Sequence, residues 1–537
     1  MKGLIYKSIL GLALVTVSIT TFTSCIDENE PTEYATEKQA SSSASSVKAL
    51  LYGVSSYFNA EGTDNGNHYE YGYSSIMRIR DAETGDLPNV NSDYEWYNYW
   101  LCDKLLGSNN AFSRYVWKYY YAFIAKTNTL IESVDTTNAS QEQLGCLGAG
   151  YAFRALIYSD MAPMYEFLSN DKISSTNSDG HNVEGLTVPI VTDTTTEAGS
   201  RNNPRVSKAK MVAFILSDLK KAEKYIPYLQ ESDKILPHLS SVYGLEARVY
   251  LWNEDYVNAE AAARKAIDAS DVAPMDSAAC LDTKKGFNQL DSWMWGSQQT
   301  SEDATVKTGI VNWTSFACNE TEFGYNSAGP QTMIDKSMYD RINNTDWRKL
   351  EWVAPQGTAL YGRNSYIDST VFKGAIVDYG SLKFRPNEGN YEDYTKGAAS
   401  AYPVMRVEEM YFIEAEAAAH LDAAKGKSLL ESFMKTYRDP HYTCKATTQD
   451  GIIDEIIFQK RVELWGEGRT FYDIKRLNYS VTRGYPGTNF YATSCFNTNG
   501  RPAWMNFCIY RTEAENNPAL AGWNNPDPSN VYTPWSE

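Results

Sequence analysis

Residues 207–267 read SKAKMVAFILSDLKKAEKYIPYLQESDKILPHLSSVYGLEARVYLWNEDYVNAEAAARKAI, and this stretch decides the expected fold. Its apolar residues recur at spacings of three and four, which is the period of one face of an α-helix. Three such faces follow one another, at 211–226, 242–252 and 256–267. Ser207 can cap the first helix. The short polar turn between the last two favours antiparallel neighbours, so the stretch predicts helices that pack side by side.

Small residues mark where these helices approach one another. Ala247, Ala259 and Ala266 follow the spacing of the helix-contact positions in a tetratricopeptide unit. Other segments have a similar helical period: 115–132 with 144–165, 406–421 with 427–437, and 452–464 continuing toward 476. One pair cannot bury its apolar face alone, whereas stacked pairs share a continuous core. The sequence therefore predicts a mainly α-helical, tetratricopeptide-like scaffold of about four helix pairs.

Long irregular segments interrupt the helices and are rich in Gly, Asn, Asp, Tyr and Trp. They are 60–105, 168–206, 270–400 and 479–537. Segments of this length are unusual as simple connectors and often carry function, so we expect the ligand-binding subregion mainly in 60–105 and 270–400. A few short strands are expected there, one of them near 379–384. Because no Ser-rich linker recurs after residue 46, residues 47–537 are predicted to form a single unit.

The first 46 residues have the pattern of an export and anchoring segment. Lys2 and Lys7 precede an apolar stretch at 9–22, and small residues then lead to Cys25. This pattern is typical of a signal peptide, here 1–24, that ends at a lipidated cysteine. The apolar stretch is shorter than the roughly 20 residues of a membrane-spanning helix. Residues 25–46 are therefore predicted to be a lipid attachment site, Cys25, followed by a flexible, Ser-rich tether.

Charge and cysteine content narrow the class of ligand. The formal net charge is -18, and no run of five Lys or Arg residues occurs, so nucleic acid is not an expected partner. The cysteines form no CxxC motif or Cys/His cluster, and we expect mostly buried thiols, with Cys495 and Cys508 the nearest candidates for one disulfide. No cofactor is predicted, although a structural calcium ion that orders the loops stays an open alternative.

Three stretches carry a family resemblance. They are NPRVSKAKMVAFILSDLKKAEKYIP at 203–227, PVMRVEEMYFIEAEAAAHL at 403–421 and QKRVELWGEGRTFYDIKRL at 459–477. In these features the chain resembles the SusD/RagB family of outer-membrane nutrient-binding lipoproteins, although Gly466 stands where the family more often has an aromatic residue. The resemblance implies a SusD-like fold, a location on the outer membrane facing the cell exterior, and a SusC-like TonB-dependent transporter as partner. The acidic run after Cys25 is typical of this exported group.

Two carboxylates raise an enzymatic alternative. Glu463 and Glu467 lie four residues apart on one predicted helix face, as a catalytic pair could. Basic residues interleave with them, however, and charges among so many apolar neighbours are usually paired and structural. We therefore predict that the protein is not an enzyme. A surface glycoside hydrolase, with two carboxylates across a cleft, stays an alternative, as does a helical-repeat scaffold that binds peptide.

Aromatic residues point to a glycan as the captured ligand. The chain has 13 Trp and 39 Tyr, and they are densest in YEWYNYW at 94–100. Sugars offer flat C–H faces and hydroxyls, so a site needs exposed aromatic rings with polar groups at the rim. The resemblance implies that this early region lies beside aromatics of the central insertion, where Tyr325 is near the candidates. The predicted ligand-binding residues are Asp81, Trp96, Tyr97, Asn98, Trp100, Trp293, Trp295 and Trp313, whereas Trp117, Trp252 and Trp465 are expected in the core.

Overall fold

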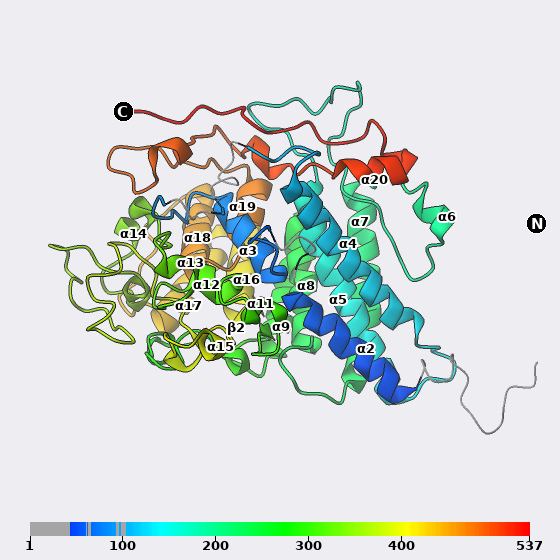
Figure 1. The fold of residues 1–537 in the computed structure, drawn as a ribbon, viewed down its shortest axis with the longest axis horizontal. Coiled ribbons are helices and arrows are strands. Elements are labelled where there is room, and N and C mark those ends of the chain that lie inside the picture. Colours follow the sequence, from blue (N-terminus) through cyan, green and yellow to red (C-terminus); the bar gives the residue numbers. More distant parts are fainter. Residues whose placement is uncertain (1–42, 61, 63–65, 93–95, 98–103) are drawn as a thin grey trace, which may run out of the picture.

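The computed structural model describes residues 43–60, 62, 66–92, 96–97 and 104–537 (Figure 1). Its described part is mainly α-helical, with two short strands, which confirms the predicted fold class. The long helices are α2 (Ala44–Ser56), α3 (Tyr73–Ala82), α4 (Ala111–Glu132), α5 (Gln141–Tyr165), α7 (Lys208–Tyr225), α8 (Leu239–Trp252), α9 (Tyr256–Asp268), α16 (Val407–Leu421), α17 (Ala423–Tyr437), α18 (Gln449–Glu463) and α19 (Thr470–Leu477). The predicted signal peptide, Cys25 and most of the tether lie outside the described residues. None of the described helices has the length and apolar character that a membrane crossing requires.

The long helices pack as neighbours in a continuous stack. Helix α5 contacts α4 on one side and α7 on the other, and α8 contacts both α7 and α9. Helix α9 then packs against α16, although the long central insertion separates them in sequence, and α16 contacts α17 and α18 (Figure 1). Each helix thereby covers the apolar face of the next, as the spacing of small and apolar residues predicted.

Local sequence explains how the deciding stretch folds. Ser207 caps α7, as predicted, by accepting a hydrogen bond from the backbone N–H of Lys210. Met211, Ile215 and Leu219 of this helix are fully buried, so the predicted apolar face is the packed one. Burying a face of this kind supplies most of the stability of such a helix, since helix propensity alone is a weak contribution.

We expected the helix that begins near residue 452 to continue toward residue 476. The structure instead has two helices there, with a turn between them. Helix α18 ends at Glu463, and α19 begins at Thr470. Gly466 and Gly468 have φ angles of 77° and 69°, in the left-handed region that side chains rarely adopt. A Cβ on Gly466 would also lie 2.4 Å from the Phe384 ring. This turn explains why a glycine replaces the aromatic residue at position 466.

The two strands bring together the two ends of the central insertion. Strand β1 (Trp295–Gln298) pairs antiparallel with β2 (Ala401–Met405), with Ser297 opposite Tyr402. The strand expected near 379–384 is not present as a regular strand, because this segment forms only isolated bridges, from Gly380 to Met333 and from Ser381 to Trp352. Every residue of β2 is buried, so the pair belongs to the core.

One large hydrophobic core extends from Val47 to Tyr532. It includes Trp117, Trp252 and Trp465, which confirms their predicted burial. The predicted disulfide between Cys495 and Cys508 is wrong, because both are free thiols. All described cysteines are buried and unpaired, whereas Cys102 lies outside the described residues. Burial raises the pKa of the Cys508 thiol, which leaves it a poor nucleophile.

The two carboxylates of the possible catalytic pair are bound by buried basic groups. Glu463 accepts hydrogen bonds from Arg438 at 2.7 Å and from Arg406 at 3.2 Å. Glu467 accepts from Arg406 at 2.9 Å and from Lys383 at 2.8 Å. Burial alone would raise the pKa of Glu463, but the guanidinium groups of Arg438 and Arg406 outweigh it and hold the pKa well below its usual value. A carboxylate in this state is a poor general acid, so the network is structural, as predicted.

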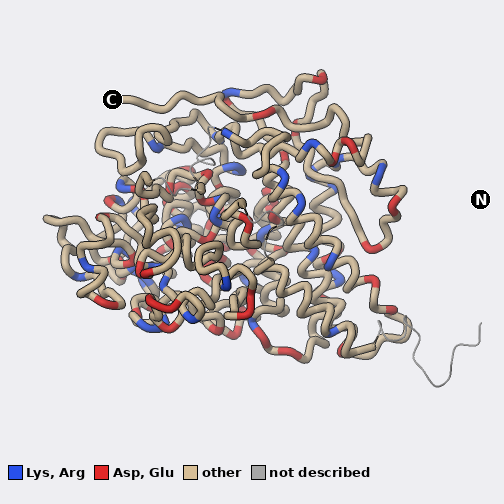
Figure 2. Tube along the Cα trace, in the orientation of Figure 1, with Lys and Arg blue, Asp and Glu red and all other residues tan. Residues whose placement is uncertain are grey.

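Basic and acidic residues are interspersed along the described trace (Figure 2). Many of them form ion pairs inside the molecule, such as Arg154 with Asp218 at 2.7 Å and Arg248 with Glu409 at 2.6 Å. Both partners of each pair are almost fully buried. Buried charges require such partners, because their desolvation is costly.

Candidate ligand-binding site

An aromatic cluster joins the early region to the central insertion. The half-buried indole of Trp96 stacks on the His68 ring, with centroids 4.7 Å apart and an interplanar angle of 23°. Its Nε1 donates a hydrogen bond to the Tyr325 hydroxyl oxygen at 2.8 Å, and the His68 ring nitrogen Nδ1 also lies against this hydroxyl. We call His68, Trp96 and Tyr325 the Trp96 cluster. Because one hydroxyl group meets both rings, the orientation of the indole is fixed.

Stacked rings support this cluster from inside. Tyr325 stacks on Phe316 with centroids 4.6 Å apart, and Phe316 stacks on Tyr71 at 5.3 Å. Tyr97 meets the edge of the Phe316 ring at 5.1 Å, and its own hydroxyl bonds that of Tyr71. Aromatic pairs in such geometries contribute about 0.5–1.5 kcal/mol each beyond their buried area. The cluster is therefore mounted on a rigid base and needs little reorganisation to receive a flat ligand.

Polar groups lie beside the aromatic rings. Arg78 Nη2 donates to the Asn89 side-chain oxygen at 2.6 Å and to the Thr332 hydroxyl at 2.9 Å. Its guanidinium carbon is 5.6 Å from the centroid of the Tyr97 ring. The small cavity that Arg78, Asn89, Trp96 and neighbouring residues line has a volume of only about 10 Å³, which is the space of one water molecule. This cavity is therefore too small for a sugar ring.

The charge state of His68 suits a stacking role. Burial lowers the pKa of His68 below its usual value, so its imidazole is neutral near pH 7. A neutral imidazole stacks on the indole as an aromatic ring and brings no positive charge to the cluster. His68 was missed in the sequence because a single histidine in a loop gives no signal, and only its position beside Trp96 reveals it.

Three predicted platforms are wrong, because Trp293, Trp295 and Trp313 are buried in the core. Their exposed fractions are 0%, 0% and 3%. Trp295 lies in β1, and Trp313 packs against Phe384 with ring centroids 5.0 Å apart. Indoles without an open face cannot stack on a ligand, and the shared flat surface expected from Trp96 and these three residues does not exist. The central insertion reaches the cluster through Phe316 and Tyr325 instead.

The other predicted residues have different outcomes. Tyr97 lies next to Trp96 but is buried, so its ring supports the cluster. Asp81 is not a rim residue, because its buried carboxylate accepts a hydrogen bond from the backbone N–H of Gly468 at 2.9 Å. Burial raises the pKa of Asp81 to about 7. Asn98 and Trp100 lie outside the described residues.

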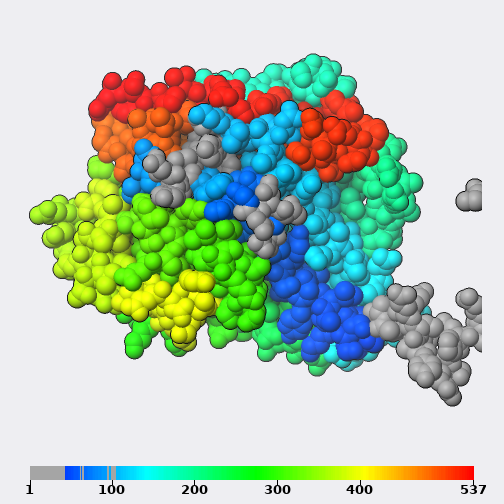
Figure 3. Space-filling model, viewed as in Figure 1, coloured from blue at the N-terminus to red at the C-terminus, as the bar shows by residue number. Residues whose placement is uncertain are grey.

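Figure 3 shows the blue surface of the early segment directly beside the green surface of the central segment. Among the described residues, no group of three or more His, Cys, Asp or Glu side chains could hold a metal ion. The described residues of the Trp96 cluster offer aromatic stacking and hydrogen bonding.

Two family models match the chain. The model described as "SusD family" matches residues 291–534, and the one described as "Starch-binding associating with outer membrane" matches residues 64–251. The first covers the last helices and the central insertion after residue 291, and the second covers most of the early loop region and the helices through α8. No curated protein matches the chain.

Solved structures share the fold over almost their full length. A SusD-like carbohydrate binding protein from Bacteroides vulgatus is 21% identical, with a TM-score of 0.68, covering 89% of this chain and 97% of that one. A SusD superfamily protein from Bacteroides thetaiotaomicron is 18% identical, with a TM-score of 0.64, covering 89% and 98%. Surface glycan-binding protein A from Bacteroides uniformis is 13% identical, with a TM-score of 0.61, covering 89% and 99%. At these identities the likeness establishes the fold.

Proposed function

Because this chain belongs to the SusD/RagB family, we propose that it binds a glycan over the Trp96 cluster. The observation that carries the proposal is the contact of Trp96 with His68 and Tyr325, which fixes one half-exposed indole on a rigid aromatic base. Two of the similar structures, a carbohydrate binding protein and a surface glycan-binding protein, support the same ligand class.

Stacking on the Trp96 indole would select the apolar face of a sugar ring. Arg78 lies beside Trp96 and is only partly buried, so its guanidinium group can bond sugar hydroxyls, whereas the neighbouring Asn89 and Asn326 are buried. An open site with one principal platform gives weak, reversible binding, because little of the ligand is removed from water. Weak capture suits a protein that passes its ligand on.

We further propose that the captured oligosaccharide passes to a SusC-like TonB-dependent transporter in the outer membrane. The proposed lipid on Cys25 would hold the folded unit at the outer surface, facing the cell exterior. The name of the second matching family, which mentions association with the outer membrane, supports this location. The net charge of -18 disfavours polyanionic partners such as nucleic acid.

Binding without catalysis is the function that the buried carboxylates favour. Glu463 and Glu467 are bound by basic side chains and lie in the core, so they cannot act on a surface-bound sugar. Incubation of the protein with polysaccharides should therefore release no reducing ends. Release that persists after a second, independent purification would instead support the hydrolase alternative.

Affinity electrophoresis across a panel of polysaccharides tests the binding proposal. The wild-type protein should be retarded by at least one glycan, and Trp96→Ala should abolish the retardation. Trp523→Ala is a matched control, because Trp523 is 37% exposed and also stacks on a histidine, His181, at 4.2 Å. It should remain retarded. Loss of retardation in Trp523→Ala but not in Trp96→Ala would place the glycan elsewhere and overturn the proposal.

A further inference from the structure

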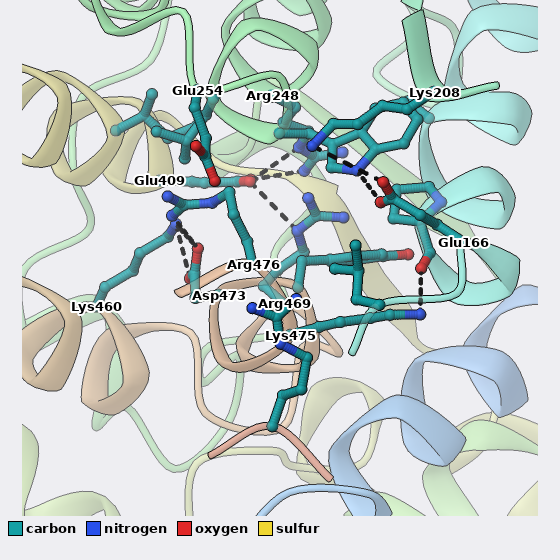
Figure 4. A pocket seen from close by; sticks show the side chains of 18 residues that line it. Glu166, Lys208, Arg248, Glu254, Glu409, Lys460, Arg469, Asp473, Lys475 and Arg476 are labelled. Carbon is teal, nitrogen blue, oxygen red and sulfur yellow. Dashed lines mark hydrogen bonds and ion pairs between the residues drawn. The ribbon is translucent and has the colours of Figure 1, made fainter. Parts of the chain in front are cut away.

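The second feature of interest is a charged cavity that shares no residue with the Trp96 cluster. Its volume is about 120 Å³, and its walls come from α5, α7, α8, α16, α18 and α19, with the segments just before α19 and after α5 (Figure 4). Its mouth is formed by partly exposed Lys208 and Arg501 and by exposed Glu254. The cavity therefore reaches solvent from the interior of the helix stack.

Positive charge prevails around this cavity. Seven basic and four acidic side chains line it, an excess of three positive charges. Asp160 and Glu416 lie behind the lining and pair with Arg469 and Arg476, and Arg80 also pairs with Asp160. Counting these three residues still leaves an excess of two positive charges with Lys475 protonated, and of one with Lys475 neutral, since burial lowers the pKa of Lys475 well below its usual value. In a protein whose net charge is -18, such a concentration of buried cations requires a specific reason.

The carboxylates of the lining are shared between cations. Glu409 accepts hydrogen bonds from Arg248 at 2.8 Å and lies 3.3 Å from Arg469. In Figure 4 its carboxylate lies between these two guanidinium groups. Asp473 likewise contacts Lys460 at 2.8 Å and Arg476 at 3.2 Å. Within the lining, two carboxylates thus contact four cations, and two of these cations also pair with Asp160 and Glu416 behind the lining.

Two buried basic residues of the lining differ from the rest: within the described part of the chain, one forms no ion pair and the other has an N–H donor without a partner. Lys475 Nζ donates to the backbone carbonyl oxygens of Pro163, Met164 and Met505 at 2.7, 3.1 and 2.6 Å, and forms no ion pair within the described part of the chain. Three acceptors match the three N–H groups of an ammonium ion. Arg248, which is 6% exposed, has a buried Nη1 that finds no hydrogen-bond partner among the described residues. A buried donor without a partner is rare, and it is met by a ligand, an ion or an ordered water.

We propose that this cavity binds a small oxyanion, either inorganic phosphate or sulfate, or the carboxylate of an acidic monosaccharide. Arg248 Nη1 donates to the anion from within, and Lys208 and Arg501 close over it at the mouth. Guanidinium groups suit oxyanions, because their N–H donors match the spacing of the oxygens. A cavity of about 150 Å³ accepts benzene, so a space of this order admits one such group and excludes an oligosaccharide. The site is independent of glycan capture at the Trp96 cluster.

Calorimetric titration of the purified protein tests this proposal, with phosphate, sulfate and glucuronate added separately at constant ionic strength. At least one anion should bind at one site and raise the melting temperature saturably. Arg501→Gln and Lys208→Gln should each weaken binding by about tenfold, because each removes a charge-assisted hydrogen bond. Both side chains are partly exposed, so these variants should fold normally, which circular dichroism can check. Glucuronate binding alone identifies an acidic sugar, and phosphate or sulfate binding identifies an inorganic anion.

Arg363→Gln is the matched control, because Arg363 is exposed, lies outside the cavity lining and changes the net charge equally. It should bind the anion as the wild type does. The proposal is overturned if none of the three anions binds at concentrations up to about 10 mM. It is equally overturned if Arg363→Gln loses as much affinity as Arg501→Gln, since the loss would then come from the change in net charge and not from the cavity. Retardation by a neutral glycan should be unchanged in all three variants, which separates this site from the proposed glycan site.

Discussion

Trp96 Nε1 donates a hydrogen bond to the hydroxyl oxygen of Tyr325 at 2.8 Å, across 229 positions of the chain. This single bond connects the early aromatic region to the central insertion. Because the same hydroxyl lies against His68, it sets the relative orientation of both rings. The geometry of the proposed glycan platform therefore depends on a residue that itself lies mostly inside the protein.

Tyr325→Phe should weaken glycan binding without unfolding the protein. The substitution keeps the ring stacked on Phe316 but removes the acceptor for the indole N–H, which is worth about 1 kcal/mol or roughly fivefold in affinity. The half-buried indole can still find water, so the effect on stability should be small. Affinity electrophoresis measures the change. Tyr361→Phe, at an exposed tyrosine, is the control, and equal losses in both variants would contradict this role for Tyr325.

The helices were predictable and the platform was not, for a physical reason. Helix formation depends on residues three and four apart, so Met211 and Ile215 reveal the face of α7 within one turn of sequence. Exposure of an indole depends on distant segments. Trp295 is buried because its strand pairs with β2, more than a hundred residues away, and no local pattern contains this information. The density of aromatics located Trp96 but could not separate it from Trp313.

Trp313→Ala should destabilise the protein strongly and spare the glycan platform. Removing a large buried aromatic side chain typically costs 3–5 kcal/mol, through lost burial and the cavity left behind. Trp96→Ala should cost clearly less, since its indole is only half-buried. Urea denaturation of both variants gives the two free energies. If Trp313→Ala is as stable as the wild type yet no longer binds glycan, Trp313 is a platform after all.

Cys25→Ser should release the protein from the membrane fraction. A cysteine with two or more acyl chains gives stable attachment, whereas the folded unit has no described helix able to cross a membrane. Radiolabelled palmitate should enter the wild-type protein and be absent from the variant. Ser41→Ala, in the tether, should leave both labelling and membrane attachment unchanged. Cys25→Ser protein that stays membrane-bound would show that another element anchors the chain.

Glu463→Gln should destabilise the fold by about 3–5 kcal/mol, because it removes a buried counter-charge that the guanidinium groups of Arg438 and Arg406 share. The pKa of Glu463 is lowered in the folded protein, so its stabilising contribution is present above its unfolded pKa, about 4.3, and is lost as the pH falls below that value. Urea denaturation at pH 7 measures the effect. Glu302→Gln, in an exposed pair with Lys307, should change stability by less than about 0.5 kcal/mol. Similar small losses in both variants would show that the buried network does not stabilise the fold.

Asp81→Asn should make the protein more stable at pH 8 and change how the free energy of unfolding depends on pH. Burial raises the folded-state pKa of Asp81 to about 7, against about 3.9 in an unfolded chain. Between these values the folded state holds a proton that the unfolded state has released. The contribution of Asp81 to the free energy of unfolding therefore falls as the pH rises, by up to about 1.4 kcal/mol per pH unit, and levels off above pH 7.

Asparagine has nearly the same shape and can still accept the hydrogen bond from Gly468, but it does not ionise. Relative to the wild type, Asp81→Asn should therefore become more stable as the pH rises from 5 to 7. Above pH 7 this gain in the free energy of unfolding should stay constant. Urea denaturation of both proteins at each pH measures this difference. Subtracting the wild-type free energy of unfolding from that of the variant removes the contributions of other buried carboxyl groups, such as Glu351. Asp291→Asn, at an exposed position, should show no such trend. A difference independent of pH would mean that Asp81 titrates alike in both states, and that its carboxylate is solvated in the folded protein.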